Sequence, residues 1–307
     1  MRGEGKNLYH FAAPPDTRGM TLYEFLRGPL GLSRMMVSRL RREGGIYLNG
    51  EEVFTRTMVL PGDRVTIRLP PEDIGQVVPQ PLPLEIIHED GEILVVNKPP
   101  GQVVHPTRDY KAGTVANAVA YHWSVRGEPR RIRPVHRLDK NTSGLLVFAK
   151  NALVHHYLDR QRGKQGECMF SRYYLAAVRG HPPRSEGKIQ GGIARHPEKQ
   201  AFRIVSREGK PATTYYRTLR QWPDASLLLI KISTGRTHQI RVHLKHLGCP
   251  ILGDTMYGEA SPLIGRQALH AWRLTLRLPR LGLGRTFTAP LTTDLKELLR
   301  ELSLGKG

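Results

Sequence analysis

The residues best suited to chemistry lie in one stretch, Arg133 to Lys150, where a single carboxylate, Asp139, stands in a polar turn. Cations flank it at Arg137 and Lys140, and the apolar run that follows, 145–149, predicts a buried strand. A carboxylate held beside cations at the start of a strand is ionised, and its position is fixed by the surrounding chain. A nucleophile or an electrostatic stabiliser needs both properties. The alternative is a structural role, because Asp often caps turns with its own side chain.

The charge of the chain favours a polyanionic partner. Its 307 residues include 47 Lys and Arg against 27 Asp and Glu, a formal net charge of +20. Such a field attracts nucleic acid or an anionic membrane surface, although a basic excess can also serve solubility alone. No stretch approaches the roughly 18 uninterrupted apolar residues of a membrane span, and residues 1–19 lack the apolar centre of a signal peptide. We therefore expect a nucleic-acid partner and no membrane association.

The cysteines and histidines do not indicate a metal centre. Cys168 and Cys249 lie far apart in the chain, which fits a reducing, cytoplasmic setting without disulfides. His238, His243 and His246 lack the paired spacing and the glutamate of a zinc-binding helix. The glycine pairs likewise lack the lysine or the spacing of a phosphate-binding loop. We expect no metal and no cofactor.

Composition divides the chain into four regions. Residues 1–19 are expected to be a polar tail, and residues 20–69 a small α+β domain. Residues 70–83 contain five prolines and predict a stiff, extended linker. Residues 84–307 then form the large domain. A monomer is expected, because no predicted helix carries a sustained heptad pattern.

The small domain is predicted to present an arginine-rich helix. Ser33 is a good N-cap for a helix that ends near Glu43. The hairpin signal Asn49-Gly50 follows, and then an alternating strand up to Leu69. Apolar residues share one side of the helix, and the other side carries Arg34, Arg39, Arg41 and Arg42.

This small domain resembles the S4 RNA-binding domain over about residues 20–69. The resemblance lies in Leu32-Ser33-Arg34 with its arginine helix, in Ile46-Tyr-Leu-Asn-Gly50 and in Pro61-Gly-Asp-Arg-Val65. It implies that the guanidinium groups contact RNA phosphates, which position an RNA without reading its sequence. The alternative is a helix face that is merely solvated.

The large domain reads as mixed α+β around a largely antiparallel sheet, because strand signals outnumber helix signals. Strands are expected near residues 93–96, 145–148, 174–178, 227–232 and 274–278. Helices are expected over 114–123, 152–160, 237–247 and 293–302, with Thr237 as the N-cap of the third.

From residue 84 onward the chain resembles the RluA-type family of RNA pseudouridine synthases. The motifs are the Arg133–Lys150 stretch, Arg172-Tyr-Tyr-Leu-Ala-Ala-Val-Arg-Gly180, Thr234-Gly-Arg-Thr-His-Gln-Ile-Arg-Val-His-Leu244, Leu94-Val-Val-Asn-Lys-Pro-Pro-Gly101 and Leu247-Gly-Cys-Pro-Ile-Leu-Gly-Asp254. The resemblance implies an enzyme that isomerises uridine to pseudouridine in RNA. An S4 domain ahead of it is the arrangement of members that modify large-subunit ribosomal RNA. Transfer RNA as substrate, or a non-catalytic RNA-binding or ribosome-assembly protein on the same scaffold, are the alternatives.

The resemblance also assigns three catalytic residues. Asp139 matches the aspartate that attacks the target nucleotide, either as a nucleophile or by stabilising positive charge on the sugar while a proton leaves C2′. Tyr174 matches a tyrosine that stacks on the extruded base and assists proton removal at C5. Arg241 matches the basic residue that pairs with the aspartate, and Arg236 is its competitor for that role.

Other residues match positions that contact RNA. Arg137 matches the arginine that fills the gap left by the flipped nucleotide. Arg172 stands where a lysine is usual in the family. His136 is expected to pack or to contact RNA, without acting as a base. Tyr173 is expected on the opposite strand face from Tyr174, packed in the core.

Overall fold

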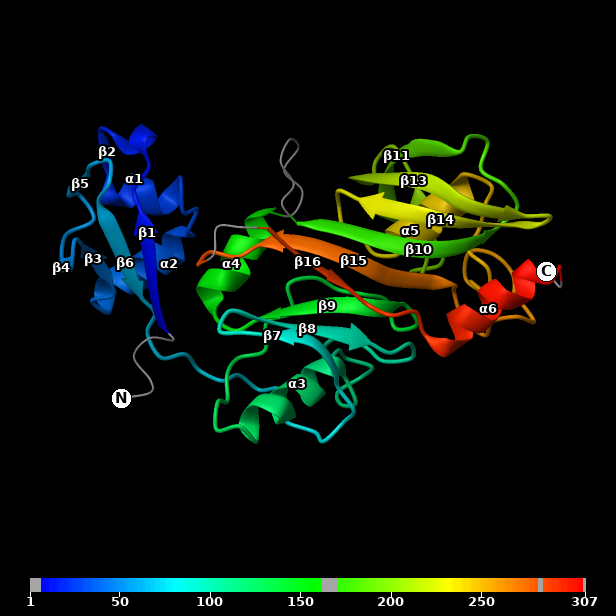
Figure 1. Ribbon diagram of the computed structural model, residues 1–307, viewed down its shortest axis with the longest axis horizontal. Coiled ribbons are helices and arrows are strands. Elements are labelled where there is room, and N and C mark those ends of the chain that lie inside the picture. The colour runs from blue at the N-terminus through cyan, green and yellow to red at the C-terminus, as the bar shows by residue number, and fades with distance from the viewer. Residues whose placement is uncertain (1–6, 162–169, 281–283, 306–307) are drawn as a thin grey trace.

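The computed structural model describes residues 7–161, 170–280 and 284–305. Figure 1 shows a small N-terminal part beside a larger part that contains a long sheet. The N-terminal part and the larger part are joined by residues 70–83, which form no helix or strand. Within the described residues, the helices are all too short or too polar to cross a bilayer.

The N-terminal part is a four-stranded antiparallel sheet with two helices against it. The strand order is β1-β6-β3-β4, and two further short strands, β2 and β5, pair with each other. The elements are β1 (Leu8–Ala12), β2 (Met20–Thr21), α1 (Leu22–Arg27), α2 (Arg34–Arg42), β3 (Ile46–Leu48), β4 (Glu51–Glu52), β5 (Met58–Val59) and β6 (Arg64–Arg68), with a short 3-10 turn at Pro15–Thr17.

The prediction of a polar tail over residues 1–19 was wrong for residues 8–12. Strand β1 pairs along its whole length with β6, and Tyr9 is buried in the core. A five-residue strand with polar neighbours gives a weak signal, and its partner β6 lies more than fifty residues away in the sequence. Residues 1–6 lie outside the described residues.

The predicted arginine helix is confirmed as α2. The Ser33 hydroxyl accepts a hydrogen bond from the Met36 backbone N–H at 3.1 Å, as an N-cap does. Val37 and Leu40 are buried. The hairpin turn is also as predicted, since Asn49 and its neighbouring glycine have φ values of 54° and 96°, which the tight two-residue turn requires.

The linker is held against the larger part at several points. Asn117 donates from its side chain to the Val78 carbonyl at 2.7 Å, and the Gln80 side chain accepts from the Gly113 N–H at 2.7 Å. Arg133 forms an ion pair with Glu72 at 2.8 Å. These contacts fix the path of the chain between the two parts.

The larger part confirms the predicted mixed α+β class. Its ten-stranded sheet has the order β12-β11-β13-β14-β10-β15-β9-β8-β7, and β16 pairs with β15. Only the β9–β15 pair is parallel among the described strands. The strands are β7 (Glu85–Glu89), β8 (Ile93–Lys98), β9 (Ser143–Ala149), β10 (Ser171–Arg179), β11 (Glu186–Arg195), β12 (Arg203–Val205), β13 (Lys210–Trp222), β14 (Ala225–Ile232), β15 (Leu269–Arg277) and β16 (Gly284–Thr288).

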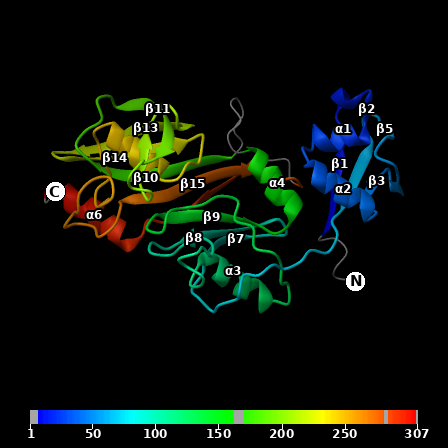
Figure 2. The same cartoon turned by 180° about the vertical axis from the view of Figure 1, so that it is seen from behind.

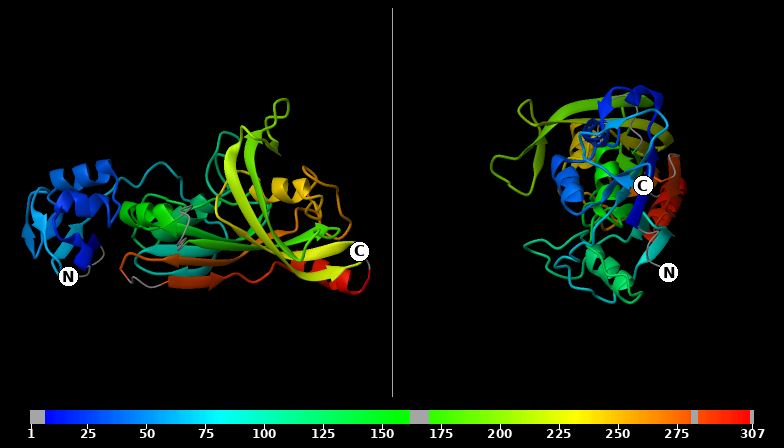
Figure 3. Two further views of the ribbon diagram at one scale, coloured as in Figure 1. Left: turned by 90° about the horizontal axis from the view of Figure 1, so that it is seen from above. Right: turned by 90° about the vertical axis from the view of Figure 1, so that its left-hand side faces the viewer.

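Four helices accompany this sheet: α3 (Val115–Ser124), α4 (Ala152–Gln161), α5 (Gln239–His246) and α6 (Thr293–Ser303). Figure 3 shows the portion with β11, β13 and β14 curving around α5. Strand β9 follows the Asp139 turn and approaches β15 so closely that a Cβ on Gly144 would lie 2.3 Å from the Ala271 carbonyl oxygen. Gly144 also has a φ of 109°, so only glycine suits this position.

The predicted start of α5 was wrong. The N-cap is His238, in a left-handed conformation with a φ of 57°, and not Thr237. The Gln239 side chain makes the local bonds instead, since its oxygen accepts from the Arg236 N–H at 3.1 Å and from the Thr234 hydroxyl at 2.8 Å. The backbone of His238 therefore departs from helical geometry directly before α5 begins.

Helix α4 lies between the N-terminal part and the large sheet (Figures 1 and 2). Asn151, just before α4, donates to the Tyr9 hydroxyl at 2.7 Å. Arg160 on the helix donates to the Gly28 carbonyl at 3.3 Å. Arg280 donates to the Leu8 carbonyl at 2.9 Å and lies over the Tyr9 ring. The two parts therefore share an interface around Tyr9 and α4, where these polar contacts lie beside apolar packing, because Tyr9 and Leu158 belong to one buried hydrophobic cluster.

Candidate active site

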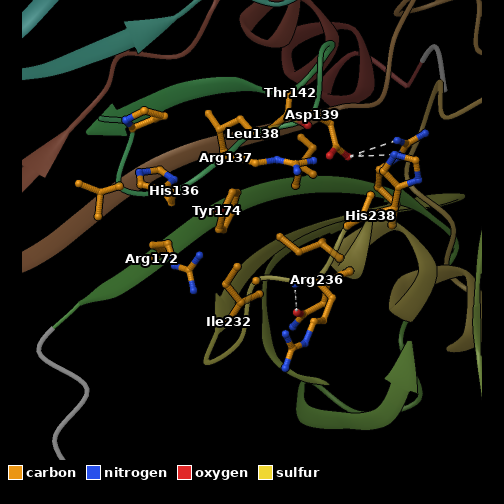
Figure 4. Close-up of a pocket in the computed structure, with 18 of the residues that line it drawn as sticks. His136, Arg137, Leu138, Asp139, Thr142, Arg172, Tyr174, Ile232, Arg236 and His238 are labelled. Atoms are coloured by element: carbon orange, nitrogen blue, oxygen red, sulfur yellow. Dashed lines mark hydrogen bonds and ion pairs between the residues drawn. The ribbon is translucent and has the colours of Figure 1, made fainter. Parts of the chain in front are cut away.

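A cleft with a volume of about 440 Å³ opens between the Asp139 turn, strand β10 and the start of α5. Figure 4 shows its side chains pointing into one hollow. Seven residues singled out in the sequence line it together: Arg137, Asp139, Tyr174, Arg241, Arg236, Arg172 and His136. The α2 arginines belong to the N-terminal part and do not line this cleft.

The Asp139 turn is anchored by a buried lysine. The Lys98 side chain is fully buried, and its ammonium donates to three carbonyl oxygens, those of Pro99 at 2.7 Å, Gln102 at 2.9 Å and Lys140 at 2.8 Å. The pKa of Lys98 is lowered to about 7, mainly by burial and also by Arg266, while Asp139 acts in the opposite direction. The bond to Lys140 fixes the backbone directly after Asp139. Sequence reasoning missed this role, although a lysine ending an apolar strand was a visible signal.

Arg241 is the cation that meets Asp139. Its Nη1 lies 3.2 Å from Asp139 Oδ2. Its Nε and Nη2 bind the two oxygens of Asp254, at 2.7 and 2.8 Å. Burial alone lowers the pKa of Arg241, but Asp254 and Asp139 outweigh it and raise the pKa. The guanidinium is therefore a permanent cation clamped between two carboxylates.

This geometry also separates the two arginines that the sequence left in competition. Arg236 is exposed and donates to the Pro211 carbonyl at 3.3 Å. Figure 4 shows it on the far side of the hollow from Asp139. Arg241 is buried, whereas the helical stripe predicted a position off the core. Asp254, which holds it, was not predicted, because the pairing depends on a turn after α5.

Tyr174 lies on β10 with its side chain in the cleft and only 4% exposed. Burial raises the pKa of Tyr174, Arg172 opposes this rise and Asp139 adds to it. The phenol is thus neutral near pH 7. Tyr173 is on the opposite face, as predicted, but it is half-buried beside Lys231 and is not part of the core.

The remaining predicted residues form the walls of the cleft. Arg172 is buried, donates to the Thr234 carbonyl at 3.2 Å and lies 5.7 Å from the Phe170 ring. His136 is buried and meets Phe170 edge-on, with ring centroids 5.7 Å apart. Arg137 is exposed at the mouth of the cleft.

His238 is a cleft residue whose role the sequence did not reveal. Its Nδ1 lies 2.8 Å from the Tyr257 hydroxyl, and its Nε2 lies 3.9 Å from Asp139 Oδ2. Burial lowers the pKa of His238, although Asp139 acts in the opposite direction. The imidazole is therefore neutral near pH 7, so Arg241 supplies the positive charge nearest Asp139.

The histidines considered for zinc have separate partners. His243 bonds to the Thr214 hydroxyl at 2.9 Å, whereas His238 faces Tyr257. Over the described ranges, no three His, Cys, Asp or Glu side chains are grouped in a way that could hold a metal ion. Cys168 lies outside the described residues.

Comparisons with known proteins identify the fold and the family of the chain. A solved human structure, RNA pseudouridylate synthase domain containing 4, superposes with a TM-score of 0.56 at 25% identity, covering 71% of this chain and 93% of that one. The fold is therefore that of a pseudouridylate synthase. The family model described as RNA pseudouridylate synthase matches residues 92–246.

Bacterial relatives extend the match to most of the chain. The uncharacterized RNA pseudouridine synthase YhcT of Bacillus subtilis is 38% identical over 284 residues, which covers 92% of this chain and 93% of the relative. The ribosomal large subunit pseudouridine synthase D of Pasteurella multocida is 39% identical, covering 84% and 83%. The chain belongs to the RNA pseudouridylate synthase family and is an RNA-modifying isomerase.

Proposed function

We propose that this enzyme isomerises uridine in large-subunit ribosomal RNA, with Asp139 as the group that attacks the target nucleotide. The observation that carries the proposal is the contact between Asp139 and Arg241, in a cleft that Tyr174 also lines. Ribosomal RNA is favoured because relatives from Pasteurella multocida and Vibrio parahaemolyticus are named for the ribosomal large subunit.

The reaction moves the uracil without changing its composition. The bond between N1 and C1′ breaks, the base rotates, and a bond from C1′ to C5 replaces it while the C5 proton is lost and N1 gains one. Asp139 serves either as a nucleophile toward the nucleotide or as the anion that stabilises positive charge on the sugar. Arg241 keeps the Asp139 carboxylate in place while the N1–C1′ bond breaks and the C5–C1′ bond forms, because Asp254 binds the guanidinium of Arg241 through its Nε and Nη2.

The neutral Tyr174 side chain would act mainly as a stacking surface and a hydroxyl partner for the rotating base. A buried phenol with a raised pKa stays protonated, which disfavours a free phenolate base. Arg137, exposed at the mouth of the cleft, would occupy the space that the flipped nucleotide leaves.

The N-terminal part would act as an S4-like RNA-binding domain. Arg34, Arg41 and Arg42 are exposed on α2 and available to phosphates. Arg39 is engaged within the protein, since it pairs with Glu43 at 3.1 Å and reaches the Pro71 carbonyl. We further propose that the protein is a monomer and that it works in the cytoplasm, where its ribosomal RNA substrate is made.

The substrate is tested by mapping pseudouridine in ribosomal and transfer RNA from cells with and without the gene. We expect one or a few sites in large-subunit ribosomal RNA to revert to uridine in the deletion strain. A wild-type copy should restore them, and an Asp139→Asn copy should not. Loss confined to transfer RNA sites would overturn the ribosomal assignment while keeping the chemistry. Unchanged profiles in both RNAs would instead favour a non-catalytic role.

A further inference from the structure

Five neighbouring strands carry a row of alternating cations and aromatic rings on the sheet face that points away from the cleft. The pairing places Lys188 opposite Tyr215, Tyr215 opposite Lys231, Lys231 opposite Tyr173, and Tyr173 opposite Arg273. Directly paired residues of adjacent strands point to the same face. The five side chains therefore form one continuous line, the cation–aromatic row.

The orientation of the row follows from strand alternation. Tyr174 and Ile232 line the cleft, so Tyr173 and Lys231, next to them in sequence, face the other way. On β13, Thr214 bonds to α5, and its neighbour Tyr215 faces away from that helix. A shallow groove of about 440 Å³ runs along this outer face.

The side chains of the row are accessible and their charges are not neutralised. Lys188, Tyr215 and Arg273 are exposed, and Lys231 and Tyr173 are half-buried. Lys188 lies 5.8 Å from the Tyr215 ring centre, and Lys231 lies 5.7 Å from that of Tyr173. Among the described residues, none forms an ion pair with the three cations.

The next residues on the same face of these strands include one acid and one base. Glu186 of β11 lies opposite Arg217 of β13, and Arg217 lies opposite Leu229 of β14. Cross-strand cation–π pairs also stabilise a sheet by themselves. That purely structural explanation does not require solvent-accessible rings or three cations without an ion pair, whereas a polyanion with flat bases complements both features.

We propose that the cation–aromatic row is a second RNA-binding surface, which holds single-stranded RNA outside the target nucleotide. The lysines and the arginine meet phosphates, and bases stack on the two tyrosine rings. Four strand spacings of about 4.8 Å give the row a length of about 19 Å, which matches about six stacked nucleotides. The proposal rests on the RNA substrate of the proposed function but not on its catalytic step.

The test measures RNA affinity of the full-length protein by fluorescence anisotropy over a range of salt, with a single-stranded uridine-rich oligonucleotide and a ribosomal RNA fragment. The variant combines Lys188→Gln, Lys231→Gln and Arg273→Gln. We expect affinity to fall at least tenfold, and the slope of log affinity against log salt to decrease by about 2, because three phosphate contacts are lost. The matched control changes Lys210, Lys245 and Lys296 to Gln, three exposed lysines away from the row.

Ring variants separate binding from sheet stability. Tyr173→Leu with Tyr215→Leu should weaken RNA binding at least tenfold, whereas the two Tyr→Phe changes should retain it because the stacking face remains. An equal loss in the control triple variant, or a lowered melting temperature with unchanged RNA affinity, would overturn the proposal. Unchanged RNA affinity in the row variants would also overturn the proposal. The row would then serve a protein partner or the stability of the sheet. The isomerisation rate of the row variants at saturating RNA should stay within twofold of wild type. A wild-type protein that binds RNA without isomerising it would contradict the proposed function and not the proposed RNA-binding surface.

Discussion

At the scale of single residues, the proposed catalytic role of Asp139 depends on how firmly this carboxylate is held. Two buried basic side chains hold this carboxylate and its turn. Arg241 contacts the carboxylate, and Lys98 binds the carbonyl of the next residue. Both side chains are held in place by further hydrogen bonds, Arg241 by Asp254 and Lys98 by the carbonyls of Pro99 and Gln102. In the proposed reaction, a carboxylate placed in this way would meet the sugar without first reorganising.

The Asp254 clamp gives a prediction at this scale. Asp254→Asn removes one charge from a buried pair, so Arg241 should lose its fixed orientation. We expect kcat to fall about 100-fold, as for other misplaced catalytic groups, with RNA affinity within about threefold and a stability loss of about 3 kcal/mol.

The matched control for this variant is Glu259→Gln, which removes an exposed carboxylate that pairs with Arg179 at the surface. It should leave kcat within twofold, since exposed pairs contribute little. If Asp254→Asn also kept kcat within twofold, the clamp would have no part in catalysis.

At the scale of elements, the parallel contact between β9 and β15 holds the Asp139 turn from behind. His270 on β15 is fully buried and bonds to the Ser143 hydroxyl of β9 at 2.9 Å. Burial lowers the pKa of His270 to about 4. The folded protein therefore holds this imidazole neutral where the unfolded chain would protonate it.

A pH dependence of stability follows from His270. Between its unfolded pKa of about 6.5 and its folded pKa of about 4, the unfolded chain binds more protons. The stability due to this group is thus fully present above pH 6.5 and is lost as the pH falls toward 4, by up to about 3 kcal/mol. Denaturant unfolding at pH 7.5 and 5 should show a smaller decrease in His270→Asn than in the wild type. An equal decrease in both proteins would exclude His270 as the cause.

Helix α2 offers a test of the N-terminal part with a control on the same helix. Arg34→Gln with Arg41→Gln should weaken RNA binding and reduce the salt slope by about 1 to 2, because two phosphate contacts are lost. Arg39→Gln should change neither, since Arg39 is engaged by Glu43 and Glu72. An unchanged salt slope in the double variant would remove α2 from the RNA interface.

Most elements were predictable from the sequence because their signals are local. The apolar run after Asp139 predicted β9, and Ser33 predicted the start of α2. Strand β1 was missed because its partner is distant in the sequence. The left-handed His238 that starts α5 was missed because Thr237, the usual type of N-cap, stands next to it.

The candidate site was predictable where its residues match family motifs and unpredictable where tertiary contacts decide. The cleft brings together Asp139, Tyr174 and Arg241. The contacts of Lys98, Asp254 and His238 depend on segments that meet only in the folded chain. Likewise, the engagement of Arg39 depends on Glu72 across the linker.

At the scale of the whole molecule, α4 joins the N-terminal part to the cleft. Its Arg160 contacts the N-terminal part, while Asp159 beside it lies at the edge of the cleft. With a net charge of +20, the molecule presents RNA with exposed cations on α2, around the cleft and along the outer face of the sheet. A structured RNA could therefore contact the enzyme at several points while one nucleotide enters the cleft.

The most direct test of the account compares purified wild-type protein with Asp139→Asn on a large-subunit ribosomal RNA transcript. Pseudouridine is measured by mass spectrometry, and RNA affinity is measured in parallel. We expect wild-type protein and the cleft-edge control Asp159→Asn to convert the target uridine. Asp139→Asn should form no pseudouridine above background and still bind RNA within threefold of wild type. Conversion by Asp139→Asn at a rate within tenfold of wild type would contradict the central role of this carboxylate.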